Sequence, residues 1–576
     1  MFNMRKLRFG TRRTKVVANV LVLIAILLIL GAAFSSKTFG LPPEIIGVND
    51  DATDKSNNNA ADQMLPGNDE DEIKQLTEER IKADKLVEIN KNEYNDPTGE
   101  RLKMAKDYYQ KIFKIFRKGE PKCKIVQRKS SAGAETVGVE SIDNSPVLTK
   151  EYLASFIDLS KDQRKELTKS HELMVKSLPD SYPEGLYKGN GIVYVGGGAF
   201  NWYALLSIQH LRRLGCTLPI EVIIPEIDEY ETDLCQRLFP TYGAHCIFLP
   251  KVLDNDVRSD FLFKGYQYKS LALLVSSFEN VLMLDADNIP TTNPEIIFKA
   301  EPFNSTGLVV WPDFWKRTTS PDFYSIAGIK LNEKSRTSKG YARYGKYEKP
   351  NCPEGKVLLH QLKGAIPDPS SESGQLLISK KEHTKDILMA LYYNLYGPNY
   401  FYPLFSQGAA GEGDKETFIA GAHVLNRPYY QVRQLVSPIG MYKNGKFRGV
   451  AMRQADPMAD YQLGIKYKDS VEPVKEEPKM MFMHVNFPKL DPIKLKVEEF
   501  VFDAETKKRN RFFGDDFARK LGYDFELAQY QNMKIFACDP DVQFEYFRKK
   551  NISQKELCDE VMSQLEYLES TTDVAE

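Results

Sequence analysis

The chain has 576 residues, of which 42% are hydrophobic and 27% are charged. These fractions exclude a polytopic membrane protein and a wholly disordered chain, and the length leaves room for one large or two ordinary domains. The formal net charge is −1 at pH 7, so there is no basic excess that would point to nucleic acid. We therefore expect a globular protein with appendages and no nucleic-acid partner.

The first 34 residues have the composition of a membrane anchor. Residues 1–15 carry six basic and no acidic residues, and residues 16–34 form an apolar run with one clearly polar member, Asn19. As a helix this run would be about 28 Å long, which matches a hydrocarbon core of about 30 Å. Because basic flanks stay cytoplasmic, we predict a cytoplasmic tail at 1–15 and a transmembrane signal-anchor at 16–34. A cleaved signal peptide is the alternative, although its apolar region would be shorter.

Residues 35–150 are predicted to form a lumenal stem, a disordered tether followed by a helix. Residues 35–72 are rich in Asn, Asp, Ser and Pro and lack the apolar residues that a core needs, whereas apolar residues recur at helical spacing over 73–118. The lumenal globular domain is predicted to span 151–576. Since the lumen is oxidising, we expect one or two disulfides among the seven cysteines, with the pairing open.

Strands and helices alternate in the first part of this domain. The alternation indicates an α/β fold with a parallel, three-layer sheet, whose ligand site lies at the carboxyl ends of the strands. The turn Gly196-Gly197-Gly198 lacks the G-x-G-x-x-G spacing because Asn201 occupies the third position, so it is either a tight turn or a nucleotide contact through Gly197. The predicted strands are 191–195, 220–224, 246–249 and 281–284, and the predicted helices are 200–214 and 266–278.

The strongest chemical signal is the pair Asp285 and Asp287, which follows the fourth predicted strand. In an extended chain the two side chains point to the same side. Two carboxylates so close together need a counter-charge, and hard oxygen ligands suit magnesium or manganese. The pair therefore predicts a divalent-cation site that holds a diphosphate, with a solvated turn as the alternative. Lys264 and Lys269, one helix earlier, are either surface lysines or candidate phosphate contacts.

Five stretches share their order and spacing with one known family. They are Gly191–Pro225, Lys264–Pro294, Gly307–Lys316, Glu372–Lys380 and Gly413–Gly421. In these stretches the chain resembles the fungal Golgi mannosyltransferases that build mannan branches on N-glycans, in particular the α-1,2-mannosyltransferases that add the first side-chain mannoses to the α-1,6-linked backbone. The resemblance implies a GT-A type fold with a mostly parallel central sheet, GDP-mannose as donor and Mn²⁺ as cofactor.

The same resemblance implies where the protein works and what it meets. The expected location is the Golgi membrane, as a single-pass type II protein whose catalytic domain faces the lumen. Its expected partners are GDP-mannose, a mannan or N-glycan acceptor, the Golgi membrane through one helix, and other Golgi mannosyltransferases in a complex.

Later residues are candidates for sugar binding and catalysis. Glu372 and Gln375 precede an apolar run and would contact sugar hydroxyls, with the capped start of a strand or helix as the alternative. Asp414 and Glu416 begin a predicted helix, where acids also favour the helix dipole, and would contact the acceptor or the reacting sugar. By resemblance to GT-A enzymes with a late metal-binding histidine, His484 is assigned as the third metal ligand; a buried core histidine is the alternative.

The resemblance implies a retaining α-1,2-mannosyltransferase that moves mannose from GDP-mannose onto mannose residues of N-linked mannan, and these residues are its candidate site. Trp311 and Trp315, two of the three tryptophans, are interpreted either as core packing or as a platform for sugar faces. The alternatives are a haloacid-dehalogenase-like phosphatase, another nucleotide-sugar transferase, or a non-catalytic mannan-binding scaffold. The predicted site comprises Glu372, Asp414 and Glu416 as catalytic residues, Gly197, Lys269, Asp285 and Gln375 as donor-binding residues, and Asp285, Asp287 and His484 as metal ligands.

Overall fold

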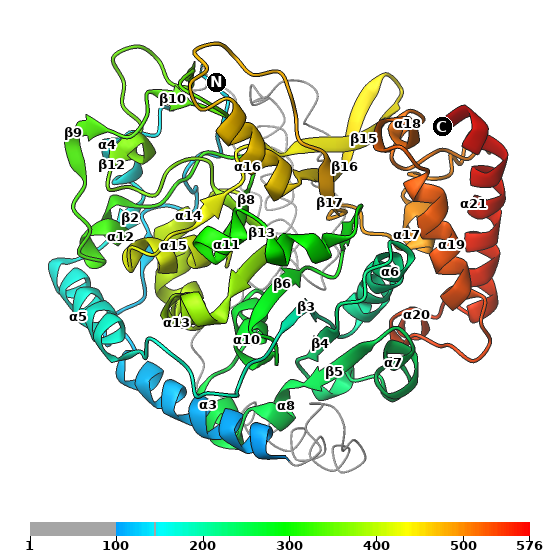
Figure 1. The fold of residues 1–576 in the computed structure, drawn as a ribbon, viewed down its shortest axis with the longest axis horizontal. Helices are drawn as coiled ribbons and strands as arrows, with labels where there is room; N and C mark the ends of the chain where they lie inside the picture. Colours follow the sequence, from blue (N-terminus) through cyan, green and yellow to red (C-terminus); the bar gives the residue numbers. More distant parts are fainter. Residues whose placement is uncertain (1–98, 143–145, 576) are drawn as a thin grey trace, which may run out of the picture. The chain divides into compact units, whose positions relative to one another are not determined.

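The computed structural model describes residues 99–142 and 146–575. Its central element is a seven-stranded sheet with the strand order β14-β8-β13-β6-β3-β4-β5 (Figure 1). β6, β3, β4 and β5 run parallel to one another, whereas β13 runs antiparallel to both β6 and β8. The strands are β3 (Asn190–Val195), β4 (Ile220–Ile224), β5 (Ala244–Phe248), β6 (Asn280–Leu284), β8 (Leu308–Pro312), β13 (Ser371–Ser379) and β14 (Tyr430–Gln431).

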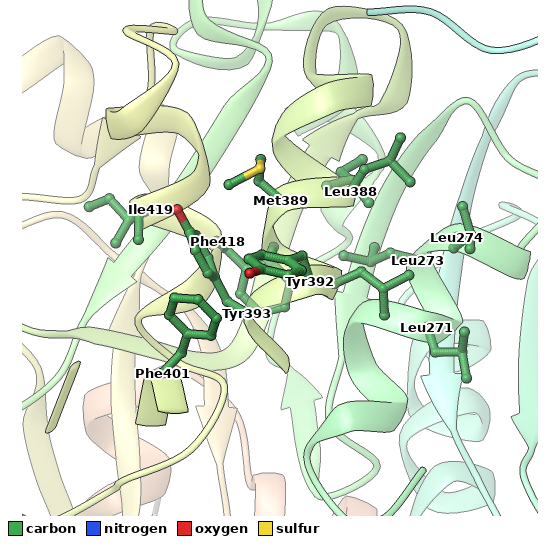
Figure 2. Close-up of a cluster of buried hydrophobic side chains, with 14 of the residues drawn as sticks. Leu271, Leu273, Leu274, Leu388, Met389, Tyr392, Tyr393, Phe401, Phe418 and Ile419 are labelled. Atoms are coloured by element: carbon green, nitrogen blue, oxygen red, sulfur yellow. The ribbon is translucent and has the colours of Figure 1, made fainter. Parts of the chain in front are cut away.

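Alternate residues of the central strands pack into two hydrophobic cores. Ile192 and Tyr194 of β3 belong to one core and Val193 to the other, as the two-residue period of a strand requires. Helices α6, α19 and α21 contribute to the first core and α10, α13 and α15 to the second, where Leu271 and Tyr392 lie (Figure 2). These helices are α6 (Ala199–Arg213), α10 (Gln267–Val275), α13 (Lys380–Leu395), α15 (Thr417–Val424), α19 (Phe525–Ala537) and α21 (Gln554–Ala575).

A second, four-stranded sheet follows the central one in the chain twice, after the short turn between β6 and β7 and after residues 432–436 between β14 and β15. Its order is β15-β16-β17-β7, and all its pairs are antiparallel. β7 begins at Asn288, so residues 285–287 form the turn that leads from the central sheet into the second one. The strands are β7 (Asn288–Pro290), β15 (Ser437–Lys443), β16 (Lys446–Ala455) and β17 (Met480–His484).

The order of the parallel strands indicates where a ligand would bind. The chain places β4 and β5 successively on one side of β3, then returns to form β6 on the other side. The strand order therefore reverses between β3 and β6, and ligands of open α/β sheets bind at the carboxyl ends of the strands that flank such a reversal. The Gly196–Gly198 turn follows β3 at this edge, and the Asp285–Asp287 turn follows β6.

Helix α3 (Glu100–Lys118) shares a core with the sheet and its helices. Its buried side chains, among them Tyr109, Phe113 and Phe116, belong to the same cluster as Leu271 of α10. The Tyr109 hydroxyl donates a hydrogen bond to the carbonyl of Leu274, 2.9 Å away. The domain boundary that we placed at residue 150 stays a prediction.

The structure corrects the predicted fold class and the predicted location, both of which included a membrane-spanning helix. Within residues 99–142 and 146–575, no helix is both long and apolar enough to cross a bilayer. The two longest, α3 and α21, carry charged side chains along their length, whereas a spanning helix needs about 20 mostly apolar residues. The predicted tail at 1–15 and anchor at 16–34 lie outside the described residues. The prediction of a single-pass type II protein of the Golgi membrane is therefore withdrawn.

Smaller elements complete the described chain. Disulfides join Cys235 to Cys246 and Cys538 to Cys558, and the second of these links the end of α19 to α21. Three two-stranded sheets lie outside the central ones: β1 (Gln127–Arg128) with β2 (Ile157–Asp158), β9 (Asn332–Arg336) with β12 (Leu362–Lys363), and β10 (Gly340–Tyr341) with β11 (Lys349–Pro350). The longer remaining helices are α5 (Lys161–Ser177) and α16 (Pro457–Lys466).

Candidate active site

Asp285 and Asp287 lie on the turn that ends β6. The backbone amide of Asp285 donates to the carbonyl of Gly374 on β13, 2.9 Å away, so the turn is tied to the neighbouring strand. The carbonyl of Asp285 accepts from the amide of Asn288, also at 2.9 Å, which closes the turn before β7 begins. The Asp285 side chain is 23% exposed and that of Asp287 only 4% exposed. The turn therefore leaves the Asp285 carboxylate partly exposed and buries that of Asp287.

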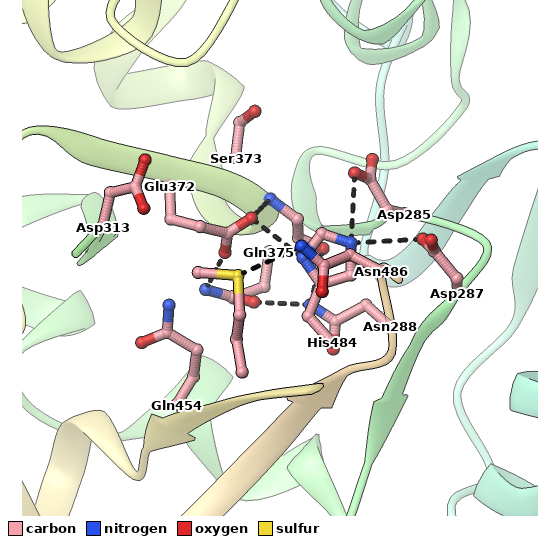
Figure 3. Close-up of polar contacts among 12 residues, drawn as sticks. Asp285, Asp287, Asn288, Asp313, Glu372, Ser373, Gln375, Gln454, His484 and Asn486 are labelled. Carbon is pink, nitrogen blue, oxygen red and sulfur yellow. Dashed lines mark hydrogen bonds and ion pairs between the residues drawn. The ribbon is translucent and has the colours of Figure 1, made fainter. Parts of the chain in front are cut away.

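His484 at the end of β17 faces both carboxylates (Figure 3). β17 pairs with β7 so that His484 lies opposite Asn288. Its Nε2 atom is 3.2 Å from Oδ1 of Asp287 and 3.8 Å from Oδ2 of Asp285. One ligand atom from each of the three residues lies within 4.8 Å of the others. Two carboxylates and an imidazole are ligands that manganese and related divalent cations accept, so this donor set fits such a cation.

The other ring nitrogen of His484 faces Glu372 on β13. Nδ1 is 3.1 Å from Oε1 of Glu372. Burial lowers the pKa of His484, but the carboxylates of Asp287 and Glu372 outweigh it and raise that pKa to about 10. At neutral pH the imidazole is therefore protonated. A cation that binds Nε2 must displace this proton, because only a neutral imidazole is a ligand.

Glu372 is held by a group of buried polar side chains. Oε2 of Glu372 accepts from Nε2 of Gln375 at 2.7 Å, and the side-chain amide of Asn288 donates to Gln375 and to the carbonyl of Gly374. Burial raises the pKa of Glu372, but His484, Lys269 and the amide of Gly374 outweigh it and leave the pKa below its ordinary value. Gln375 is fully buried, so it supports Glu372 from within the protein.

Gly374 is required by the close approach of these side chains. A Cβ atom at this position would lie 2.5 Å from Nδ1 of His484 and 2.6 Å from Oε1 of Glu372. Both distances are shorter than van der Waals contact, so any other residue here would push the histidine or the carboxylate aside.

Lys269 lies between the carboxylates of Asp285 and Asp414. Its Nζ atom is 2.9 Å from Asp285 and 3.7 Å from Asp414, and it donates to Oγ of Ser373 at 3.1 Å. Burial lowers the pKa of Lys269, but the two carboxylates outweigh it and raise the pKa above its ordinary value. Burial raises the pKa of Asp414 to about 6. Lys269 lowers this pKa and Asp285 raises it, but burial has the largest effect. At neutral pH the Lys269 ammonium is therefore charged and the Asp414 carboxyl is mainly ionised.

Lys489 is a site residue that the sequence did not reveal. It forms an ion pair with Oδ2 of Asp287, and its side chain is 35% exposed. Burial raises the pKa of Asp287, but Lys489 and His484 outweigh it and hold the pKa well below its usual range. In the sequence, only its position five residues after His484 could have indicated Lys489. Its partner Asp287 is far away along the chain, so no local pattern joins the two residues.

The structure does not bring every predicted residue to this cluster. Gly197, with a φ of +100°, lies at the end of β3, and a Cβ there would lie 2.6 Å from a carboxylate oxygen of Glu229. Glu416 is buried in an ion pair with Arg317 and accepts from the amide of Ser371 at 3.2 Å. Within the described residues, neither Gly197 nor Glu416 contacts Asp285 or Asp287.

The two tryptophans considered as a sugar platform differ in burial. Trp311 is fully buried, its Nε1 donates to the carbonyl of Ala455 at 2.9 Å, and its ring packs edge-on against Phe482. Trp311 is therefore a core residue, whereas Trp315 is only half-buried.

Comparisons with known proteins point to one kind of enzyme. A family model described as "Mannosyltransferase putative" matches residues 189–456. The chain is similar to Alpha-1,2-mannosyltransferase MNN21 of Candida albicans, with 44% identity over 529 residues, 85% of this chain and 80% of that protein. It is also similar to Alpha-1,2-mannosyltransferase MNN2 of Saccharomyces cerevisiae, with 39% identity over 469 residues, 74% of this chain and 78% of that protein. A solved structure of the galactosyltransferase LgtC aligns with 42% of this chain and 73% of the LgtC chain. The identity is 12% and the TM-score is 0.24, so this likeness assigns no function.

Proposed function

The chain belongs to the family of alpha-1,2-mannosyltransferases, and we propose that it transfers mannose from GDP-mannose to a mannose residue of an N-linked mannan acceptor. The linkage is the one that the names of the relatives state. Mannose is α-linked in GDP-mannose and would be α-linked in the product. The transfer would therefore retain the configuration of the sugar.

The observation that carries the choice of donor is the cluster of Asp285, Asp287 and His484 at the carboxyl end of β6. We assign these residues as ligands of Mn²⁺. A divalent cation there would neutralise the negative charge that develops on the departing diphosphate. Glu372 would hold the ring of His484 in the ligating orientation through Nδ1, a common arrangement for metal-binding histidines.

The two lysines at the site would contact the diphosphate directly. Lys269 and Lys489 approach the two aspartates from different elements, and both are ammonium donors suited to phosphate oxygens. Gly197 lies at the neighbouring strand end, where it would approach the nucleotide. The diphosphate would then lie between the carboxyl ends of β3 and β6.

The reacting mannose would lie beside Lys269, Ser373 and Asp414. The Asp414 carboxylate, mainly ionised at neutral pH, would accept a hydrogen bond from a sugar hydroxyl. A retaining transfer needs no general base opposite the leaving group, since an oxygen of the leaving phosphate can accept the proton from the acceptor hydroxyl on the same face. Glu416 would then act at a distance, by holding Arg317 and the start of β13 in place.

The test is a transfer assay with the full chain. We expect radiolabelled mannose to pass from GDP-mannose to an α-1,6-linked oligomannoside in the presence of MnCl₂, with an α-1,2 linkage in the product. EDTA should abolish the transfer and added Mn²⁺ should restore it. Asp287→Asn should lower the rate by about 100-fold or more while the thermal melting transition remains cooperative. Release of free mannose or phosphate without a glycan product would contradict the proposal.

A further inference from the structure

Tyr266 is an exposed aromatic side chain next to the candidate active site. It is the N-cap residue of α10, and its surface is 52% exposed. Its ring lies against the backbone of Gly413: a Cβ on Gly413 would be 2.9 Å from Cδ2 and 3.2 Å from Cε2 of the ring. The φ of Gly413 is outside the left-handed region, so the backbone conformation does not demand glycine there. The close approach of the Tyr266 ring is what demands it.

The ring of Tyr266 borders the groups that we assign to the reacting sugar. Gly413 directly precedes Asp414 in the chain. Lys269 follows Tyr266 by three residues, a spacing that puts both side chains on one face of α10. The Lys269 ammonium in turn contacts Asp285 at 2.9 Å and Asp414 at 3.7 Å. The aromatic face and the charged groups therefore lie side by side at the carboxyl edge of the sheet.

This combination suits one chemical class of ligand. A pyranose ring has hydroxyl groups around its rim and C–H groups on its faces, so it binds where polar groups lie next to an aromatic ring. We propose that Tyr266 is the surface on which a mannopyranose ring stacks at this site. The proposal rests on the proposed function, because it requires that a mannose enters there. The mannose of the donor and that of the acceptor share this chemistry, and the experiment below separates them.

Three other aromatic side chains, Trp202, Trp311 and Tyr442, are less suited to this role. Trp202 and Trp311 are fully buried, so neither offers a face to a ligand. Tyr442 is exposed, but it lies on β15 opposite Phe447 of β16. Phe447 is five residues from Met452, which pairs with His484, so Tyr442 is away from the site along the strand.

The experiment compares three variants of the full chain: Tyr266→Ala, Tyr266→Phe and, as a matched control for an exposed tyrosine, Tyr442→Ala. Initial rates are measured with GDP-mannose varied at saturating oligomannoside, and then with the oligomannoside varied at saturating GDP-mannose. We expect Tyr266→Ala to raise KM for one of the two substrates about tenfold, because a stacked ring contributes to binding. Tyr266→Phe keeps the aromatic face, so its KM values should stay within about twofold of wild type. Tyr442→Ala should change neither KM.

The outcomes are distinct. A raised KM for the oligomannoside assigns the stacked ring to the acceptor, and a raised KM for GDP-mannose assigns it to the donor. Unchanged KM values for both substrates in Tyr266→Ala, or an equal loss in Tyr266→Phe, would overturn the stacking role while the proposed function stands. If wild type transfers no mannose at all, the proposed function fails and this inference fails with it. Should Tyr266→Ala not melt cooperatively, Gly413→Ala displaces the ring instead and should raise the same KM.

Discussion

At the scale of single residues, the two ring nitrogens of His484 face opposite parts of the site. Nε2 lies 3.2 Å from Asp287, and Nδ1 lies 3.1 Å from Glu372. A carboxylate on the second nitrogen of a metal-binding histidine fixes the ring and raises its basicity. The geometry therefore favours an orienting role for Glu372, which we had expected from the sequence to contact a sugar.

Glu372→Gln should weaken Mn²⁺ binding by about 10–100-fold, because the variant loses the charge that holds the His484 ring. The transfer rate should fall accordingly and recover in part at high Mn²⁺. Titration calorimetry of the full chain with MnCl₂ gives the affinity. Asp313→Asn is the matched control, since Asp313 is a buried acid that pairs with Lys415 at 2.7 Å instead of with His484. Equal affinities of the two variants would refute the orienting role.

At the scale of elements, one antiparallel strand assembles the site. β13 lies between β6 and β8, so its first residues meet the end of β6 at the same edge of the sheet. The register with β8 shifts between Glu372 and Leu376, and this irregularity includes Ser373 and Gly374. A strand that ran parallel to its neighbours would bring its last residues to this edge instead. The direction of β13 therefore decides which residues face Asp285.

Gly374→Ala should abolish most of the transfer activity, because the added methyl group would collide with both His484 and Glu372. Gly449→Ala on β16 is a matched control: its nearest neighbours are 3.7 Å from the added Cβ, and its φ is outside the left-handed region. Both variants should melt cooperatively. We would abandon the assignment of His484 if Gly374→Ala retained Mn²⁺ affinity and activity close to those of Gly449→Ala.

Glu526 on α19 should make the stability depend on pH. Burial raises its pKa to about 7, although the carboxylate accepts hydrogen bonds from the amides of Phe512 and Phe513. Between the unfolded pKa of 4.5 and about 7 the folded chain keeps a proton that the unfolded chain has lost, so this group stabilises the fold less as pH rises through that window. Denaturant unfolding between pH 4.5 and 8 should thus show a shallower pH dependence for Glu526→Gln than for wild type. Parallel curves for the two proteins would show that Glu526 does not cause the dependence.

At the scale of the whole molecule, the catalytic core extends further towards the amino terminus than the matched family region. The family model begins at residue 189, yet Phe113 and Phe116 of α3 are fully buried in a core shared with α10 and α13. Arg101 also donates to the carbonyls of Leu186 and Ser277, which fastens α3 to the segments before β3 and β6. The described residues from 100 onwards therefore contribute to the stability of the fold.

Phe113→Ala should reduce the free energy of unfolding by roughly 3–5 kcal/mol, the usual effect of truncating a buried aromatic residue. The activity per folded molecule should not change, because the site lies on other elements. Lys114→Ala, an exposed change on the same helix, should be close to neutral. Chemical denaturation of both variants measures the difference. A loss below about 1 kcal/mol for Phe113→Ala would mean that α3 contributes little to the core.

The sequence by itself determined several local features of this protein. β3, β4, β5 and β6 occur where short apolar runs between helical patterns predicted strands, because period and burial are encoded within each segment. The Asp285–Asp287 pair was recognisable because both carboxylates follow one such strand. The resemblance to mannosyltransferases, carried by the order of local motifs, was confirmed by the comparisons.

Only the tertiary structure decided which distant residues meet at that pair. β17 pairs with β7, and this pairing brings His484 to Asp287. Lys489, five residues after His484, forms an ion pair with the same carboxylate. Glu416 is close to Asp414 in the chain, but it forms a buried ion pair with Arg317 instead. The physical reason is that these contacts depend on the order, direction and register of strands. A strand's own pattern shows which residues share a face, but not which partner that face will meet.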